Sequence, residues 1–377
     1  MPEMFVPVSA PHMEEEEKAF VRQAMEENAI SGLFGSALER FESEFAAFCG
    51  SDYAVTCSNG TTAIHLALAA AGIKKGDEVL VSTLTNMASF FAVLYLGATP
   101  IPVDIDRATL TMDAADLERK ITPRSKAVMV VHLFGQATEM RSVDKVAKAH
   151  GLLVFEDCAE AHGATYHGDV VGSLGTAGCF SFFANKILTT GEGGMVTTND
   201  PILAAKAKSL KALAFGTTNK FMHQDIGYNY RMTNIQAAIG CGQMTKADRL
   251  IEKRREIADF YSEHLARFAE HIDLPIHRPH AKNVIWMYHM VLKGALKGKR
   301  SQIMAALKDE GVETREGFIP YNLQDIFLER GLTTRDCCPV ANDVAYDSFY
   351  LPTGPGMTQD QLDYVAAKYT AILGKLI

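Results

Sequence analysis

Short apolar runs alternate with segments of helical periodicity between residues 53 and 214, and this alternation constrains the fold more than any other feature of the sequence. Strands that alternate with helices are typical of a mostly parallel sheet covered by helices on both faces. We therefore expect an α/β fold whose ligands bind at the carboxyl ends of the strands. The seven predicted strands are 54–57, 78–82, 99–103, 127–132, 152–157, 178–182 and 194–198, and the helices are 61–71, 88–96, 114–120, 141–150 and 201–214.

The length of the chain, 377 residues, predicts two domains, because a single hydrophobic core rarely grows past about 250–300 residues. We expect a large domain over residues 1–249, including an N-terminal helical segment, and a smaller α+β domain over residues 250–377. One long helix, residues 233–268, is predicted to link the two. The smaller domain is expected to contain a strand at 286–292 and helices at 301–310 and 359–373.

Composition argues against several classes of partner. The formal net charge of -8 disfavours a nucleic acid or an anionic membrane surface as partner. The longest apolar run, residues 63–73, is too short to span a bilayer. The seven cysteines show no metal-ligand spacing, so we expect reduced thiols and no metal site. With no evident signal peptide, we expect a cytoplasmic protein.

A single lysine, Lys186, follows the predicted strand 178–182, and a glycine-rich turn follows it at residues 189–194. Burial at the end of a strand lowers the pKa of a lysine and makes its neutral amine available. Such an amine can attack a carbonyl and form a Schiff base. The alternative is a surface lysine whose stem lies along the protein in a turn.

Two further stretches fit the same chemistry. The predicted strand 152–157 ends in Glu156 and Asp157, and alternation places these side chains on opposite faces, so only one can reach a given ligand. Residues 57–62 form a polar turn before a helix, and a helix N-terminus binds phosphate. A lysine, an acid and a phosphate cradle are the groups that pyridoxal phosphate needs.

Five motifs carry a resemblance that covers the chain from about residue 5 onward: SNGT at 58–61, EDCAE at 156–160, SFFANK at 181–186, TGEGGM at 190–195 and GYNYRMTN at 227–234. The chain resembles the DegT/DnrJ/EryC1/StrS family of nucleotide-sugar aminotransferases, in particular the GDP-perosamine synthases. The resemblance implies the aspartate-aminotransferase-like (type I) fold of pyridoxal-phosphate-dependent transferases. Relatives with histidine in place of the lysine dehydrate the sugar instead, so Lys186 favours transamination.

The resemblance implies a role for each matching residue. Lys186 would bind pyridoxal 5′-phosphate and carry the proton, and Asp157 would pair with the ring nitrogen. Ala159 would pack on the ring, and Glu160 would approach the ring hydroxyl. The cradle motif includes Ser58, and the phosphate ligands would be Gly60, Thr61, Ser181 and Asn229, the last from a neighbouring subunit. The protein would then be a homodimer with shared active sites.

Two positions depart from the family pattern. Asn86 replaces an aromatic residue that usually stacks on the cofactor ring, so either Phe90 or another ring substitutes, or Asn86 itself bonds the cofactor or substrate. Asn322 replaces a histidine beside the sugar site.

Four other polar residues have open roles. Arg231 is an anchor for anions or a structural ion pair, and Arg315 is a candidate ligand for a substrate carboxylate or phosphate. His162 and His132 are either acid–base groups or packed core histidines.

The expected reaction moves an amino group from L-glutamate to a keto sugar nucleotide, leaving 2-oxoglutarate, with pyridoxamine phosphate as the aminated cofactor. The expected acceptor is GDP-4-keto-6-deoxy-D-mannose, which gives GDP-perosamine for surface polysaccharide such as O-antigen. The alternatives are an aminotransferase for another keto sugar, whether linked to UDP, to dTDP or free, a dehydratase of the same fold, and a non-catalytic regulator.

Overall fold

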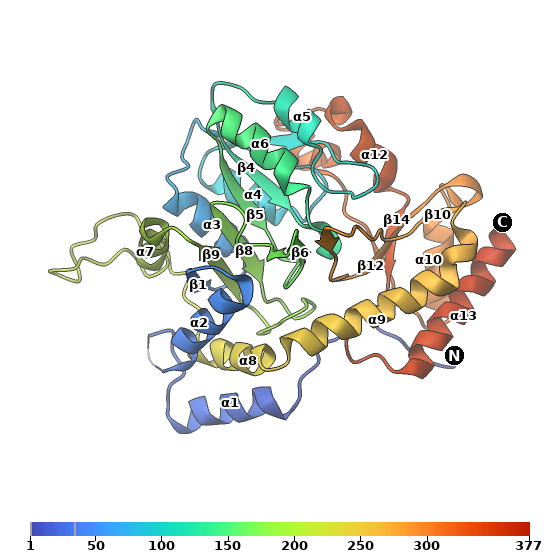
Figure 1. Cartoon of the computed structure of the whole chain (residues 1–377), viewed down its shortest axis with the longest axis horizontal. Helices are drawn as coiled ribbons and strands as arrows, with labels where there is room; N and C mark the ends of the chain where they lie inside the picture. Colours follow the sequence, from blue (N-terminus) through green and yellow to red (C-terminus); the bar gives the residue numbers. More distant parts are fainter. Residues whose placement is uncertain (1, 34) are drawn as a thin grey trace.

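The computed structural model describes residues 2–33 and 35–377, and its centre is a seven-stranded sheet (Figure 1). Only β9 runs antiparallel to its neighbours; the other adjacent strands are parallel. The expected mostly parallel α/β sheet is therefore confirmed. Its order is β1 (Tyr53–Cys57), β9 (Gly194–Thr198), β8 (Ala177–Ser181), β5 (Leu153–Asp157), β4 (Ser125–Val131), β2 (Glu78–Ser82) and β3 (Thr99–Val103).

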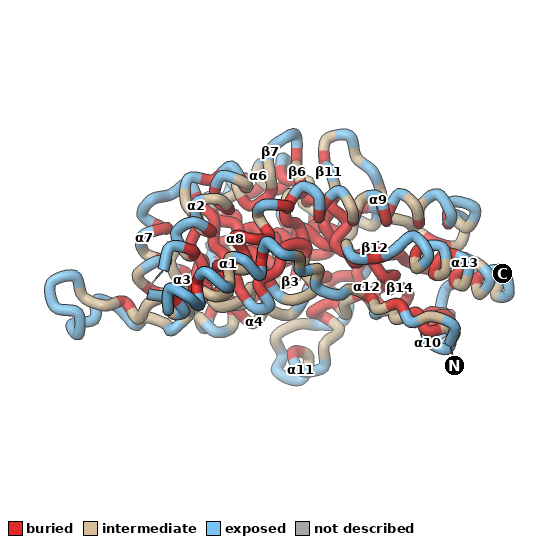
Figure 2. The backbone as a smooth tube through the Cα atoms, turned by 90° about the horizontal axis from the view of Figure 1, so that it is seen from below, coloured by how far each residue is buried: buried red, intermediate tan, exposed pale blue. Residues whose placement is uncertain are grey.

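Helices cover both faces of this sheet because successive side chains of a buried strand point to opposite sides. Val79 and Val81 of β2 belong to the hydrophobic cluster that includes Phe90, whereas Leu80 belongs to the cluster that includes Phe41. Figure 2 shows the buried backbone running through the middle of the molecule. The helices are α1 (Glu15–Glu26), α2 (Ala37–Cys49), α3 (Gly60–Ala70), α4 (Ala88–Tyr95), α5 (Ala114–Arg119), α6 (Met140–His150) and α7 (Pro201–Leu210).

Two helix predictions were wrong in extent. The helix predicted over 201–214 ends at Leu210, because Leu213 and Ala214 adopt positive φ angles of 71° and 46°. The single helix predicted over 233–268 is two helices, α8 (Asn234–Met244) and α9 (Ala247–Leu265). The break brings the buried Lys246 to Glu17 of α1, with 2.7 Å between Nζ and Oε1.

The C-terminal part of the chain forms a second sheet and its own hydrophobic cluster. The predicted boundary at 249/250 falls inside α9, and the two-domain division stays a prediction. No helix in the described ranges is long and apolar enough to cross a membrane. The second sheet has the order β10 (Ile272–Asp273), β12 (Tyr288–Leu292), β14 (Ser348–Leu351) and β13 (Arg315–Glu316), and its helices are α10 (Arg300–Asp309), α11 (Asp325–Leu328), α12 (Pro339–Ala345) and α13 (Gln359–Leu376).

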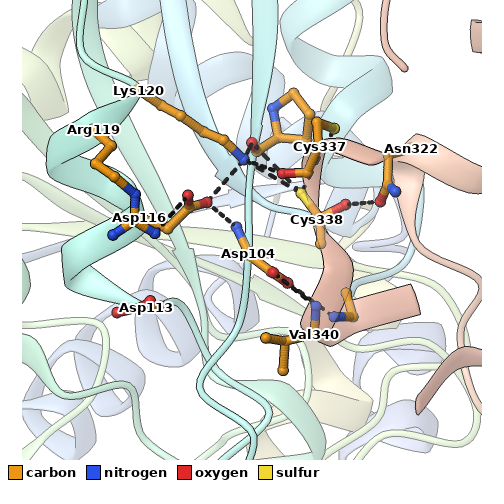
Figure 3. Close-up of polar contacts among 12 residues, drawn as sticks. Asp104, Asp113, Asp116, Arg119, Lys120, Asn322, Cys337, Cys338 and Val340 are labelled. Carbon is orange, nitrogen blue, oxygen red and sulfur yellow. Dashed lines mark hydrogen bonds and ion pairs between the residues drawn. The ribbon is translucent and has the colours of Figure 1, made fainter. Parts of the chain in front are cut away.

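A polar network fastens the segment around α12 to the main sheet (Figure 3). Asp104, just after β3, accepts hydrogen bonds from the N–H groups of Val340 and Ala341, both at 2.9 Å, and so satisfies the start of α12. Lys120 donates to the carbonyl oxygen of Cys337 at 2.7 Å. The C-terminal part is thus held against the edge of the main sheet, and its residues can reach the carboxyl ends of the strands.

Candidate active site

A cavity of about 660 Å³ lies at the carboxyl ends of the central strands. Its lining residues come from the loop after β1, the end of β5, the loop after β8 and the C-terminal part. Of the residues that the sequence singled out, those lining it are Gly60, Thr61, Asn86, Asp157, Ala159, Glu160, Ser181, Lys186 and Arg315.

Lys186 extends into this cavity from the loop between β8 and β9, and its side chain is 12% exposed. Its Nζ lies 3.7 Å from Oε1 of Glu160 and 4.0 Å from the centre of the Trp286 ring. Burial lowers the pKa of Lys186, and the carboxylates of Glu160 and Asp157 oppose this effect. The amine is therefore easier to deprotonate than that of an ordinary lysine.

Asp157 is the last residue of β5, and two donors fix its carboxylate. The Ser89 hydroxyl on α4 donates to Oδ2 at 2.7 Å, and the Ala159 N–H donates to Oδ1 at 3.1 Å. Burial raises the pKa of Asp157, while these hydrogen bonds and the charge of Lys186 oppose the rise. The arrangement gives an oriented acid at the floor of the cavity.

The neighbouring Glu156 is directed elsewhere and stabilises the fold. Its carboxylate accepts a hydrogen bond from His132 Nε2 at 3.0 Å and from three backbone N–H groups of the loop 172–175 at 2.7–2.9 Å. His132 Nδ1 in turn accepts from the Thr138 N–H at 3.1 Å. His132 is thus a packed, hydrogen-bonded residue, and the alternation along β5 separates Glu156 from the cavity as expected.

The start of α3 is a ready anion site. Asn59 caps this helix by accepting from the Thr62 N–H at 2.9 Å, whereas the N–H groups of Gly60 and Thr61 find no acceptor among the described residues. A Cβ atom on Gly60 would lie 2.6 Å from that of Ser181, so only glycine allows this close approach. Ser58 bonds the Thr62 hydroxyl at 3.2 Å and supports the turn.

Glu160 has an unusual environment for a carboxyl group. Its Oε2 accepts a hydrogen bond from the Phe134 N–H at 2.9 Å, and Phe134 has a positive φ of 53°. Burial raises the pKa of Glu160 to about 7, although the nearby Lys186 and the Phe134 N–H oppose the rise. Glu160 can therefore be protonated near neutral pH and donate a hydrogen bond to a ligand hydroxyl.

Phe90 does not substitute for the aromatic residue that Asn86 replaces. Phe90 is fully buried and stacks on Tyr321 at 3.9 Å, away from the cavity. Asn86 lines the cavity, and its Oδ1 accepts from the Ala88 N–H at 3.0 Å. The rings that do line the cavity are Tyr95, Phe183, Trp286, Phe318 and Tyr350.

His162 and Asn322 lie outside the cavity. His162 is buried among the rings of Phe45, Phe180 and Phe182, and burial lowers its pKa to about 3. Asn322 is fully buried, and both polar atoms of its side chain form hydrogen bonds. Its Nδ2 donates to the Arg335 carbonyl at 2.8 Å. Both side chains belong to the core, since neither lines the cavity.

Arg231 and Asn229 are also remote from this cavity within one chain. Arg231 lines a separate hollow of about 190 Å³ with Lys211 and Glu42. Asn229 is exposed, and its backbone pairs with Ala212. A role for Asn229 at the cofactor phosphate would need the neighbouring subunit.

Ser89 and the three rings Trp286, Phe318 and Tyr350 belong to the site but were not expected from the sequence. None of them lies in a motif. Ser89 stands three residues after Asn86, where a polar group near a strand exit was a usable signal, but the rings come from apolar stretches of the C-terminal part.

The residues present fit pyridoxal phosphate. The free N–H groups of Gly60 and Thr61 suit a phosphate, the buried Asp157 suits a protonated ring nitrogen, and Lys186 suits an aldehyde. The cavity of about 660 Å³ also leaves room for a substrate beside the cofactor.

Comparisons with known proteins agree with this geometry. The model of the DegT/DnrJ/EryC1/StrS aminotransferase family matches residues 11–370. The chain is 43% identical over 368 residues to the GDP-perosamine synthase of Caulobacter vibrioides, with 98% of each chain covered. It is 40% identical to the GDP-perosamine synthase of Escherichia coli O157:H7, with 96% of each covered. A Geobacillus stearothermophilus relative, 36% identical with 89% of each covered, is called a pleiotropic regulatory protein.

Solved structures give the same result. The aminotransferase from Psychrobacter cryohalolentis has a TM-score of 0.93 at 30% identity and covers 99% of this chain and 100% of its own. DesV of S. venezuelae, solved with a ketimine intermediate, has a TM-score of 0.88 at 32% identity and coverages of 95% and 94%. The protein is a pyridoxal-phosphate-dependent sugar aminotransferase, and it belongs to the DegT/DnrJ/EryC1/StrS aminotransferase family.

Proposed function

We propose that this enzyme transfers an amino group from L-glutamate to the keto carbon of GDP-4-keto-6-deoxy-D-mannose and so makes GDP-perosamine for surface polysaccharide such as O-antigen. The observation that carries the chemistry is the placement of the Lys186 amine, 3.7 Å from Glu160, in one cavity with Asp157 and the start of α3. The relatives named GDP-perosamine synthase support the choice of acceptor.

Each lining residue has one task in this proposal. When bound, pyridoxal phosphate supplies an aldehyde for the amine and a ring that accepts an electron pair. Asp157, oriented by Ser89, keeps the ring nitrogen protonated. Lys186 removes a proton from the donor carbon and later delivers one to the acceptor carbon. The N–H groups of Gly60 and Thr61 bind the phosphate.

The active enzyme is proposed to be a homodimer in which Asn229 completes the phosphate site of the neighbouring subunit. The segment 215–226, just before Asn229, projects beyond α7 (Figures 1 and 2). It exposes Phe221, Met222 and Ile226 by 76%, 69% and 84%. Apolar side chains gathered on a projecting loop support a protein interface there. The seven unpaired cysteines support a reducing, cytoplasmic location.

The alternatives differ in the acceptor or in the chemistry. A UDP-linked, dTDP-linked or free keto sugar would use the same Lys186 site, since only the far end of the cavity would differ. A dehydratase is disfavoured by Lys186 itself. The name of one relative, a pleiotropic regulatory protein, favours a regulatory role. A binding protein, however, has no need of a partly buried amine that lacks a hydrogen-bond acceptor among the described residues.

The test is the visible absorption spectrum of the purified protein, followed by addition of L-glutamate. We expect a yellow band that bleaches with glutamate. The bleached enzyme is then mixed with GDP-, UDP- and dTDP-linked 4-keto-6-deoxy sugars, and the return of the band is followed together with the product mass. A protein that stays colourless with pyridoxal phosphate contradicts the aminotransferase chemistry, and return of the band only with another nucleotide contradicts the acceptor.

A further inference from the structure

The aromatic ring in cation–π contact with the Lys186 amine is the only tryptophan of the chain, Trp286. The distance from Nζ to the ring centre, 4.0 Å, is within the range of a cation–π contact. Glu160 lies on another side of the same amine, 3.7 Å away. Among the described residues, no group accepts a conventional hydrogen bond from Nζ, so these two contacts define the position of the amine.

Hydrogen bonds, in addition to packing, hold the side chain and the backbone of Trp286 in place. Its Nε1–H donates to the Asn185 carbonyl at 2.8 Å, in the peptide next to Lys186. The Trp286 N–H donates to the Phe134 carbonyl at 3.0 Å, and the Trp286 carbonyl accepts from Nη1 of the buried Arg254 at 2.5 Å. Trp286 is 3% exposed. Hydrogen bonds at three of its polar atoms hold the ring face towards the amine.

We propose that Trp286 is a positioning residue for Lys186: its indole face holds the Lys186 amine beside Glu160 whenever that amine is not bonded to the cofactor. The inference rests on the proposed role of Lys186. A free lysine has a flexible four-carbon stem, and proton transfer needs its nitrogen within hydrogen-bond reach of the reacting carbon's proton. The indole restricts that freedom by attracting the ammonium form without accepting a conventional hydrogen bond from it, so the nitrogen stays beside Glu160 until it loses its proton.

The first experiment measures the reactivity of Lys186 in cofactor-free protein with trinitrobenzenesulfonate at one pH below the lysine pKa. Removing the indole removes a contact that favours the ammonium form, so the Trp286→Leu variant is expected to label Lys186 about threefold to tenfold faster than wild type. Trp286→Phe keeps a ring and is expected to lie between the two. Labelling is read by mass spectrometry of the peptide that contains Lys186.

Phe318→Leu is the matched control, because Phe318 lines the same cavity and forms no cation–π contact with Lys186. It is expected to label at the wild-type rate. A Trp286→Leu rate at or below that of wild type overturns the proposal, and so does an equal acceleration in Phe318→Leu, which would mean that opening the cavity causes the change.

A second measurement does not depend on the folding of Trp286→Leu. Because Trp286 is the only tryptophan, its emission in cofactor-free protein reports the charge on Lys186. We expect the emission to change as Lys186 loses its proton, and no such change in Lys186→Met. The other ionisable groups around the contact, Asp157, Glu160, Glu192, Arg254, Arg315 and Tyr350, remain in that variant. Identical titrations of the two proteins overturn the proposal.

These results are separable from the proposed function. If Lys186→Met keeps the yellow band with pyridoxal phosphate, the role of Lys186 is wrong. The labelling and emission experiments contain no cofactor and judge the contact between Trp286 and Lys186 by themselves.

Discussion

Two partly buried lysines of this protein have opposite environments. Lys120, in the network of Figure 3, donates to the carbonyl oxygens of Pro102 and Cys337 at 2.8 and 2.7 Å and pairs with Asp116 at 2.8 Å. Lys186 has a carboxylate at 3.7 Å and an aromatic face, and no acceptor at hydrogen-bond distance among the described residues. The first cation is fully bonded, and the second is not.

The pKa values follow the same division. Burial alone would lower the pKa of Lys120, but its hydrogen bond and charge interaction with Asp116 give a net increase. At Lys186 burial prevails, and the pKa falls. A bonded ammonium holds two segments of the fold together, whereas an unbonded amine is available to react. Burial of a lysine therefore does not identify its role, and the partners of its nitrogen do.

The largest difference is expected in activity. Lys186→Met should lower the transamination rate at least ~10³-fold, because it removes the proton carrier, and should abolish the yellow band. In cofactor-free protein its unfolding midpoint should stay at or above that of wild type, since no hydrogen bond to Nζ is lost. The assay is release of 2-oxoglutarate together with thermal unfolding. If the variant is active, or if it is strongly destabilised, Lys186 does not differ from Lys120 in the way described above.

Lys120→Met should show the reverse pattern. Removing the cation takes from Asp116 its closest ion-pair partner, although Arg119 and the Asp104 N–H remain, and it removes the Lys120 donor from two carbonyls. The free energy of unfolding should fall by about 3 kcal/mol. Urea unfolding measures this loss. Lys126→Met, at an exposed position of β4, is the control and should change the free energy by less than about 0.5 kcal/mol. The cofactor band of Lys120→Met should be unchanged; its loss would tie Lys120 to the active site.

The sequence predicted the side of the cavity that is built from local motifs. Asp157 ends a buried strand, and Lys186 and Gly60 follow two others, so the sheet itself brings them to one edge. Trp286 and Tyr350 reach the same cavity only through contacts between distant parts of the chain. Their neighbours in sequence are ordinary apolar residues, which carry no sign of a site.

The same limitation explains the misplaced residues. The sequence left two roles open for His162, an acid–base group or a packed core histidine, and its side chain turns into the ring cluster beneath α2. The helix break near Lys246 depends on Glu17, more than 200 residues away in the chain. Periodicity detects neither a long-range ion pair nor the direction of a side chain after a turn.

The Glu160→Gln variant tests how the ionisation of Glu160, the carboxyl group beside the Lys186 amine, changes stability with pH. The pKa of Glu160 is raised from 4.5 to about 7 in the folded state, so ionisation opposes folding: stability is fully present below about 4.5 and falls as pH rises towards 7. Glutamine does not ionise. The variant should therefore gain about 2–3 kcal/mol relative to wild type between pH 4.5 and 7, and no more above that. Urea unfolding at several pH values is the measurement, and a constant difference would show that Glu160 is ionised throughout.

The smallest predicted effect concerns Ser89, which donates to Asp157 at 2.7 Å. Ser89→Ala removes one of two hydrogen bonds that favour the ionised carboxylate, so the pKa of Asp157 should rise and the ring nitrogen should lose part of its charge partner. We expect kcat to fall about tenfold, equivalent to about 1.4 kcal/mol, with the cofactor still bound. Asp157→Asn, which keeps the shape of the side chain and removes its charge, should cost far more. If Ser89→Ala matches wild type in kcat, the Ala159 N–H orients Asp157 by itself, and Ser89 only fills space on α4.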